Sequence, residues 1–476
     1  MGNTSDGDAL HMFTVHGGPN HVLVIGGPHP NEPAGHQTVL FVAELLATRP
    51  ELRERWTVHL LASFDPDGAR LNEPWYRTPY DLRRYDRYFN RPALRYQPEW
   101  TFPHRVGNVE FSRTLPESRA GQKFIDETPI RRTSSLHNTD SGGAYFLITE
   151  NDERLAEDLI EIAERGGSGV NVAPLDRDGQ KEIVPGVFLR ATADETLSTA
   201  STPPTKGIQS TQYGAKRYGE RGFVGLVAEF PAWKVSPDEL TPDQQRDALN
   251  AARIRLDGDN ERLGEALRTI RETSATERLR AAIQETLEVV GRISVQAAKM
   301  AKEFDSQDVK PEVFNEIHRQ SYLVPMRAIG MLTRLLDEVG STQLAEETGQ
   351  LLDDRLSEYV RLFRPEPVLI KTLVRQQAEA ILATMRRPDE ADAVDHAPRA
   401  TLLGRLARGR LFGITAATVL AGGVGGLLGR TSEAAASVVP AGVTLAAPTR
   451  AVPGEPTGLR VVDGDTLSEL ANATGT

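Results

Sequence analysis

Along residues 1–235, short apolar runs typical of strands alternate with turns and with stretches of helical periodicity. Residues 22–26 and 56–63 form strand-like runs, and residues 34–47 between them show helical spacing. Glycine, proline and aspartate separate these stretches, as they do in α/β domains. The pattern therefore predicts an α/β domain over residues 1–235, with a mixed central sheet flanked by helices.

The hydrophobic spacing changes after residue 235. Residues 236–387 are rich in Ala, Leu, Glu, Arg and Gln at the spacing of amphipathic helices, with only a few breaks. This pattern predicts an all-α region, either a helical bundle or a helical extension. The segment PDEADAVDHAPRA, which opens residues 388–410, is acidic and lacks periodicity, so we expect a linker there.

The last part of the chain is low in complexity. Residues 411–429 are 19 residues without a charge, close to the roughly 20 that a helix needs to cross a bilayer. Arginines lie just before this segment, so as a single membrane span it would anchor the chain and leave residues 1–410 in the cytoplasm. A flexible apolar linker and a buried helix are the alternatives. Residues 430–458 are rich in Ala, Pro, Thr and Val and predict a disordered spacer.

Composition excludes several classes of protein. The net charge is -11, from 55 Lys+Arg and 66 Asp+Glu, which disfavours a nucleic-acid binder because phosphate contacts need a basic face. The chain has no Cys, so disulfides, thiolate metal ligands and a Cys nucleophile are excluded. A metal site would therefore use His, carboxylates and water. The N-terminal residues show no signal-peptide pattern, which predicts a cytoplasmic location.

Candidate chemistry lies where the predicted strands end. His29 and Glu32 follow the first apolar run, His137 follows the run RTSSL, and Glu229 follows the run FVGLVA. An Asp-rich turn at 65–68 ends another run. Ligands of open α/β sheets bind beyond the carboxyl ends of the strands, so we expect these side chains at one rim. Two His and one Glu form the ligand set of a catalytic zinc site, and a further carboxylate can act as general base.

These stretches resemble zinc metallocarboxypeptidases of the carboxypeptidase A type, and the related succinylglutamate desuccinylase/aspartoacylase deacylases. GGPHPNEPAG resembles the family's His-x-x-Glu, FDPDG its Asn-Pro-Asp-Gly turn, SLHNTDSGGAY its late zinc histidine, and VAEFP its catalytic glutamate. The stretches follow the family's order over residues 22–235. The resemblance implies a zinc carboxypeptidase-like fold and a hydrolase that uses one zinc ion per chain.

The resemblance also implies a role for each residue of the set. His29, Glu32 and His137 would bind zinc. Glu229 would take a proton from the zinc-bound water and deliver it to the leaving amine.

Arginines are implied for the substrate. RYDRYF resembles the family's Asp-Leu-Asn-Arg-Asn-Phe segment, which assigns Arg87 to the substrate's terminal carboxylate. Arg70, with Arg77 as the alternative, is assigned to the scissile carbonyl. The sequence departs from the family at Asp65 and Asp86, where the family has Asn, and a charge at Asp86 would repel a substrate carboxylate.

The end of the chain resembles a second family. Residues 459–476 (LRVVDGDTLSELANATGT) resemble the opening of a LysM module through their Gly-Asp-Thr-Leu core, which implies peptidoglycan as a partner. They are too few for a whole module, and a helix N-cap at Asp465 or Thr466 explains the same residues.

Three functions remain open on the sequence. The first is a zinc metallocarboxypeptidase that cleaves peptides, and the second is a zinc deacylase of N-acyl amino acids. The third is an inactive binding protein at a membrane or cell wall, which the complete set of candidate ligands disfavours. The arginines and aromatic residues within residues 77–103 favour the peptidase, because they predict a roomy anion-binding rim. The sequence predicts no oligomeric state.

Overall fold

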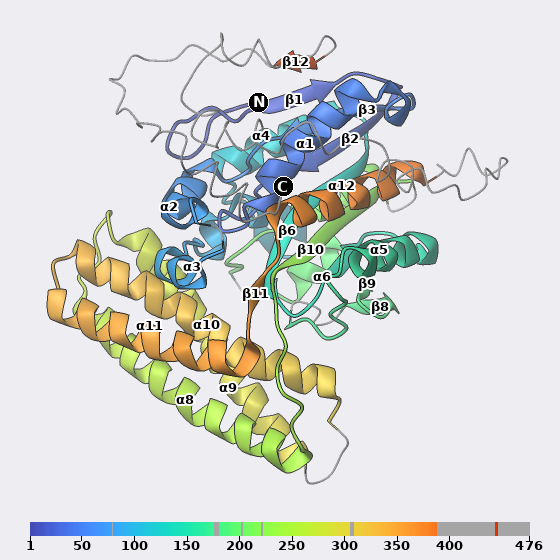
Figure 1. The fold of residues 1–476 in the computed structure, drawn as a ribbon. Helices are drawn as coiled ribbons and strands as arrows, with labels where there is room; N and C mark the ends of the chain where they lie inside the picture. Colours follow the sequence, from blue (N-terminus) through green and yellow to red (C-terminus); the bar gives the residue numbers. More distant parts are fainter. Residues whose placement is uncertain are drawn as a thin grey trace, which may run out of the picture.

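The computed structural model describes residues 1–78, 80–175, 180–200, 203–219, 222–304, 309–387 and 443–445. A mixed sheet flanked by helices forms one part, and a group of long helices packs beside it (Figure 1). The predicted α/β fold class followed by a helical region is therefore confirmed.

The central sheet has the strand order β12-β1-β3-β2-β6-β10-β7-β9-β8, and β11 pairs with the end of β10. Strands β3, β2, β6 and β10 run parallel to one another, and β7 lies antiparallel to β10. The strands are β1 (Met12–Val15), β2 (Asn20–Ile25), β3 (Trp56–Leu61), β6 (Ile130–Ser141), β7 (Tyr145–Ile148), β8 (Lys181–Val184), β9 (Val187–Leu189), β10 (Val224–Lys234), β11 (Glu366–Pro367) and β12 (Val443–Leu445). A separate hairpin joins β4 (His104–Val106) to β5 (Val109–Phe111).

Helices cover both faces of the sheet. Strand β2 shows why, because Val22 and Val24 face one hydrophobic cluster while Leu23 and Ile25 face another. A parallel strand that is buried on both faces reads as a continuous apolar run. The helices of this part are α1 (Ala34–Thr48), α2 (Pro66–Tyr76), α3 (Leu82–Tyr88), α4 (Pro116–Glu127), α5 (Glu153–Arg165), α6 (Ala193–Ser198) and α7 (Ser210–Tyr218).

The long helices α8 (Pro242–Thr269), α9 (Glu277–Glu303), α10 (Pro311–Glu338) and α11 (Thr342–Phe363) form a bundle. The bundle core continues into the sheet part, where Trp75, Tyr85 and Phe89 join the leucines and methionines of α10. The bundle therefore docks against α2 and α3, as Figure 1 shows.

The last helix of the predicted helical region packs on the sheet and not in the bundle. Helix α12 (Ile370–Arg386) lies within the predicted helical region 236–387, but it packs on the sheet beside α1 and α5 (Figure 1). The chain thus leaves the sheet after β10, forms the bundle, and returns through β11 and α12. The sheet part is therefore built from two separate stretches of sequence.

Most of the predicted C-terminal features lie outside the described residues. These are the linker 388–410, the membrane span 411–429 and the LysM-like end 459–476. Of the predicted spacer 430–458, only Val443–Leu445 are described, as strand β12 antiparallel to β1. Within the described part of the chain, no helix is both long and apolar enough to cross a membrane.

Candidate metal centre

Three adjacent parallel strands carry the predicted ligands to one edge of the sheet. His29 lies in the loop after β2, Glu32 stands just before α1, and His137 lies on β6. Glu229 on β10 is the cross-strand neighbour of His137. The sequence predicted strand ends at His137 and Glu229, but β6 continues to Ser141 and β10 to Lys234. The four side chains meet because β2 ends at Ile25, opposite Ser135, so the loop after β2 lies beside His137 and its neighbour Glu229.

His29, Glu32 and His137 form a compact buried triad. His29 Nδ1 lies 3.0 Å from Glu32 Oε1, and His137 Nδ1 lies 3.1 Å from Glu32 Oε2. The two Nδ1 atoms are 3.1 Å apart. Ligands at about 2.0–2.2 Å from a tetrahedral zinc ion would lie about 3.3–3.6 Å from one another. These distances between the donor atoms of the triad are only slightly shorter than zinc requires, and three protein ligands would leave a fourth position of the ion for water or substrate.

The protonation states of the triad suit a cation. Burial, followed by the charge of Arg91, lowers the pKa of His29 to about 3. Burial alone would raise the pKa of Glu32, but the neighbouring His29 and His137 hold it well below its usual range. Burial also opposes protonation of His137, but the carboxylates of Glu229 and Glu32 outweigh it and raise its pKa. The carboxylates thus attract positive charge to this point, and a metal ion would compete there with the proton of His137.

Glu229 borders the triad and is more exposed than Glu32. Its Oε1 lies 3.7 Å from His137 Nδ1, and its side chain is 11 % exposed, whereas that of Glu32 is 2 % exposed. A carboxylate that borders a metal site and still reaches solvent can serve as general base.

Hydrogen bonds that the sequence analysis did not predict link the Nε2 atom of His137 to further polar side chains. His137 Nε2 lies 2.9 Å from Ser135 Oγ, which lies 3.4 Å from Oε1 of the fully buried Glu99. The Ser210 hydroxyl donates to the same Glu99 oxygen at 3.0 Å, and burial raises the pKa of Glu99 to about 7. Such contacts fix the ring orientation of a metal-binding histidine. Ser135 stands two residues before His137 on a strand, so it shares the same face, and this spacing could have identified it.

Among the described residues, Arg91 is the arginine whose hydrogen bonds reach the triad. Its Nη2 lies 3.0 Å from both ring nitrogens of His29, and its Nη1 lies 3.4 Å from Glu32 Oε1. The resemblance assigned the substrate's terminal carboxylate to Arg87, which in the structure pairs with Asp337 of the bundle at 2.7 Å. Arg87 is still part of α3, which packs on α10, whereas Arg91 follows the end of that helix. Asn90-Arg91 repeats the Asn-Arg pair of the family segment, and this pair could have identified Arg91.

The structure does not bring Arg70 or Arg77 to the triad within the described residues. Arg70 lies on α2 and pairs with Asp8. Arg77 follows α2, is exposed, and lies 4.0 Å from Glu73. Neither arginine is therefore placed to polarise a carbonyl at the triad in this conformation.

Its surroundings disfavour a negative charge on Asp86. It is completely buried on α3, where burial and then the carboxylate of Asp140 raise its pKa well above its usual range. A carboxyl group that keeps its proton leaves a substrate carboxylate unopposed.

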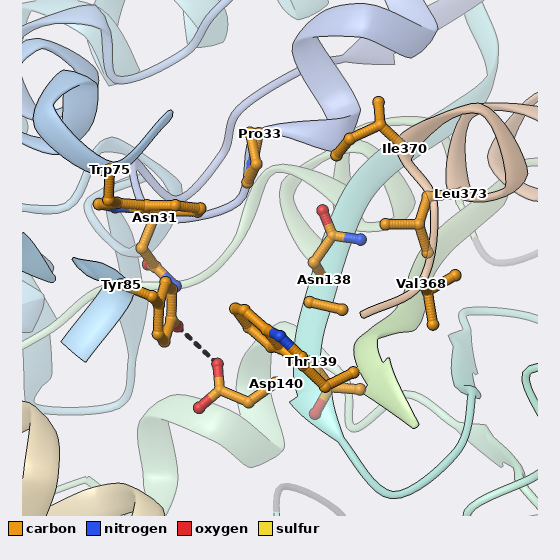
Figure 2. A pocket seen from close by; sticks show the side chains of 12 residues that line it. Asn31, Pro33, Trp75, Tyr85, Asn138, Thr139, Asp140, Val368, Ile370 and Leu373 are labelled. Atoms are coloured by element: carbon orange, nitrogen blue, oxygen red, sulfur yellow. Dashed lines mark hydrogen bonds between the residues drawn. The ribbon is translucent and has the colours of Figure 1, made fainter. Parts of the chain in front are cut away.

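Figure 2 shows a small cavity that is lined by residues adjacent in sequence to two of the triad residues. It is lined by Asn31 and Asn138, the sequence neighbours of Glu32 and His137, and by Tyr85, whose hydroxyl donates to Asp140 at 2.6 Å. Among the described residues, Asn31 Oδ1 has no hydrogen-bond partner. The cavity volume is about 20 Å³, which is room for about one water molecule and not for a substrate side chain.

One comparison with known proteins covers the triad. Residues 1–183 match the sequence model of the zinc carboxypeptidase family. The matched range contains all three triad residues and ends before Glu229. No curated protein matches the chain. The match and the triad together support a zinc hydrolase.

Solved structures with some similarity include two hydrolases. A metallo-carboxypeptidase from Burkholderia cenocepacia is 16% identical with a TM-score of 0.30, over 48% of this chain and 54% of that chain. Murine aminoacylase 3 is 11% identical with a TM-score of 0.24, over 61% of this chain and 66% of that chain. At these TM-scores neither structure carries weight for the function of this chain.

Asp65, where the resembling family has Asn, predicts a pH-dependent loss of stability. It caps α2 by accepting a hydrogen bond from Gly68 N at 2.8 Å, and burial raises its pKa to about 7. Between about pH 4 and 7 the unfolded chain ionises this group while the folded chain keeps its proton, so stability falls as the pH rises. Asp65→Asn keeps the cap and removes the ionisation, and we expect it to stabilise the protein by about 2–4 kcal/mol at pH 8.

Urea unfolding of Asp65→Asn at pH 5 and pH 8 measures this effect. Asp81→Asn is the matched control, because Asp81 caps α3 in the same way but is exposed. We expect a gain for Asp65→Asn that is larger at pH 8 and little change for the control. Equal gains at both pH values would contradict an ionisation effect.

Proposed function

We propose that this chain is a zinc-dependent metallocarboxypeptidase that hydrolyses the C-terminal amide bond of a peptide. The observation that carries the proposal is the buried triad with two charged groups beside it, the carboxylate of Glu229 and the guanidinium of Arg91. A general base and an anion-binding cation at one metal site are what an exopeptidase requires.

His29, Glu32 and His137 would hold the zinc ion. When bound, zinc supplies Lewis acidity towards a carbonyl group and a water molecule. Glu229 would take a proton from the attacking water and deliver it to the nitrogen of the leaving amino acid. The amide bond then breaks, and the peptide keeps a new carboxylate.

Arg91 would bind the terminal carboxylate of the substrate. Its side chain is 28 % exposed, so the guanidinium reaches both the triad and solvent. A cation in the triad would repel the guanidinium, whose natural partner then is an incoming carboxylate that accepts two parallel hydrogen bonds. This contact would set the distance from the chain end to the cleaved bond.

The carboxylate contact provides a direct test. Zinc-loaded full-length protein is given pairs of peptides with a free or an amidated C-terminus, together with N-acyl amino acids, and the products are identified by mass spectrometry. We expect release of single C-terminal residues from the free acids only. Arg91→Ala should lower kcat/KM for these peptides by about 10–100-fold, the value of a charge-assisted hydrogen bond of about 1.5–3 kcal/mol.

Arg83→Ala is the control, because Arg83 is an exposed arginine of the same region that pairs with Asp353. We expect it to match the wild type. Cleavage of N-acyl amino acids alone would replace the peptidase by a deacylase. Cleavage of amidated and free peptides at equal rates would contradict the role of Arg91, and no hydrolysis by zinc-loaded protein would favour a binding protein.

A further inference from the structure

Helix α12 reaches the metal centre from a distant part of the sequence. It follows the bundle in the chain, yet it lies on the sheet, with nearly all of its side chains from Gln376 to Met385 buried. Its neighbours on the sheet include α1, which begins two residues after Glu32. A segment more than 130 residues after Glu229 therefore borders the site.

Gln377 makes the contact. Its side chain is completely buried, and its Nε2 donates to the main-chain oxygen of His137 at 2.9 Å. Its Oε1 lies 2.7 Å from the hydroxyl of Thr38 on α1, which can donate to it. The orientation of the amide follows from these partners, because the carbonyl of His137 can only accept.

The main chain at His137 needs such support on one side. Pairing between β2 and β6 ends where Ile25 lies opposite Ser135, two residues before His137. On the other side β10 continues alongside, with Glu229 opposite His137. Gln377 thus supports the part of β6 that extends past the end of β2.

We propose that Gln377 is a positioning residue that holds the metal ligand His137 in place, although it lies far outside residues 1–235, the predicted α/β domain. It fixes the main chain of His137, while Ser135 fixes the far nitrogen of the ring. With both ends held, Nδ1 stays directed at Glu32 and His29. This inference rests on the proposed metal site, and it adds the returning helix α12 to the residues that build it.

The chain offers a matched control in the neighbouring residue. Gln376 is also buried on α12, but its Nε2 donates to Ala163 O at 3.3 Å and its Oε1 accepts from Ser168 Oγ at 2.9 Å. Gln376 Nε2 also lies 3.5 Å from Ile162 O, so leucine removes at least as many hydrogen bonds at position 376 as at position 377. Only one of the two changes faces the metal centre.

The experiment compares full-length wild type, Gln377→Leu and Gln376→Leu. Zinc affinity is measured by competition with a chelator, and the cobalt-substituted proteins are compared by their visible absorption spectra. We expect Gln377→Leu to bind zinc about 10–100-fold more weakly, as changes behind a metal ligand usually do, and to alter the cobalt spectrum. Gln376→Leu should keep the affinity and spectrum of the wild type.

Other outcomes separate the two proposals. If wild type and Gln376→Leu bind zinc and Gln377→Leu binds it equally well with the same spectrum, the positioning role is refuted and the metal site stands. Equal weakening in both variants would also refute it, since a general loss of packing explains that result. If the wild type binds no zinc, both proposals fail. If Gln377→Leu does not fold, Thr38→Val is used in its place, because it removes the hydroxyl that contacts the Gln377 side-chain amide. Thr38→Val must then show a smaller loss of zinc affinity and a smaller change in the cobalt spectrum.

Discussion

Replacing Glu229 by glutamine is expected to lower kcat by about 10²–10⁴-fold, the usual contribution of a general base. Glutamine keeps the size of the side chain but cannot accept a proton from water. Glu229 is not one of the three triad residues, although its Oε1 lies only 3.7 Å from His137 Nδ1. We therefore expect the variant to retain its zinc.

Two measurements on the same preparation test this expectation. Steady-state kinetics on a cleaved peptide gives kcat, and metal analysis gives the zinc content per chain. Full zinc content with a low kcat supports a catalytic role for Glu229. A normal kcat would move the general base to another group, and loss of zinc would make Glu229 a ligand.

Removing His137 is expected to abolish tight zinc binding. A four-ligand zinc site provides about 10–16 kcal/mol of binding free energy, so one ligand accounts for about 3 kcal/mol or more. His137→Ala should therefore weaken zinc binding by at least about 100-fold. The variant leaves only His29 and Glu32 of the proposed ligand set.

His36→Ala is the control for this change. His36 is a buried histidine of α1 whose Nδ1 lies 3.1 Å from Ala62 O, and it stands outside the triad. We expect it to bind zinc as the wild type does, even where cavity formation lowers its stability. Equal loss of zinc in both variants would indicate that unfolding, and not loss of a ligand, explains the result.

Because α12 packs on the sheet, the sheet part cannot be separated from the rest of the chain by cutting after residue 235. A fragment that ends at residue 235 contains His29, Glu32, His137 and Glu229, but it lacks α12 and with it Gln377. The hydrophobic clusters beside α1 and α5 would also lose their residues from α12. Metal binding and activity are therefore best measured on the full chain.

The sequence by itself determined the α/β part and the four candidate residues at its rim. Each apolar run marks a strand or part of one, and His29 lies just past the end of β2, but His137 and Glu229 lie inside β6 and β10, which continue beyond the apolar runs. Parallel neighbouring strands end at the same edge, so local pattern and strand direction together predict that these residues meet. The change to helical periodicity after residue 235 likewise predicts the bundle without reference to distant contacts.

Only the tertiary structure decided which residues surround the triad. Arg87 and Arg91 are four residues apart, and their roles depend on where α3 ends and on its packing against α10, which no local pattern specifies. The periodicity of α12 predicts one buried face, which fits a bundle and a sheet equally well, whereas in the structure every residue from Gln376 to Met385 is buried. The contact between Gln377 and His137 spans 240 residues, and it exists because the chain returns to the sheet after forming the bundle.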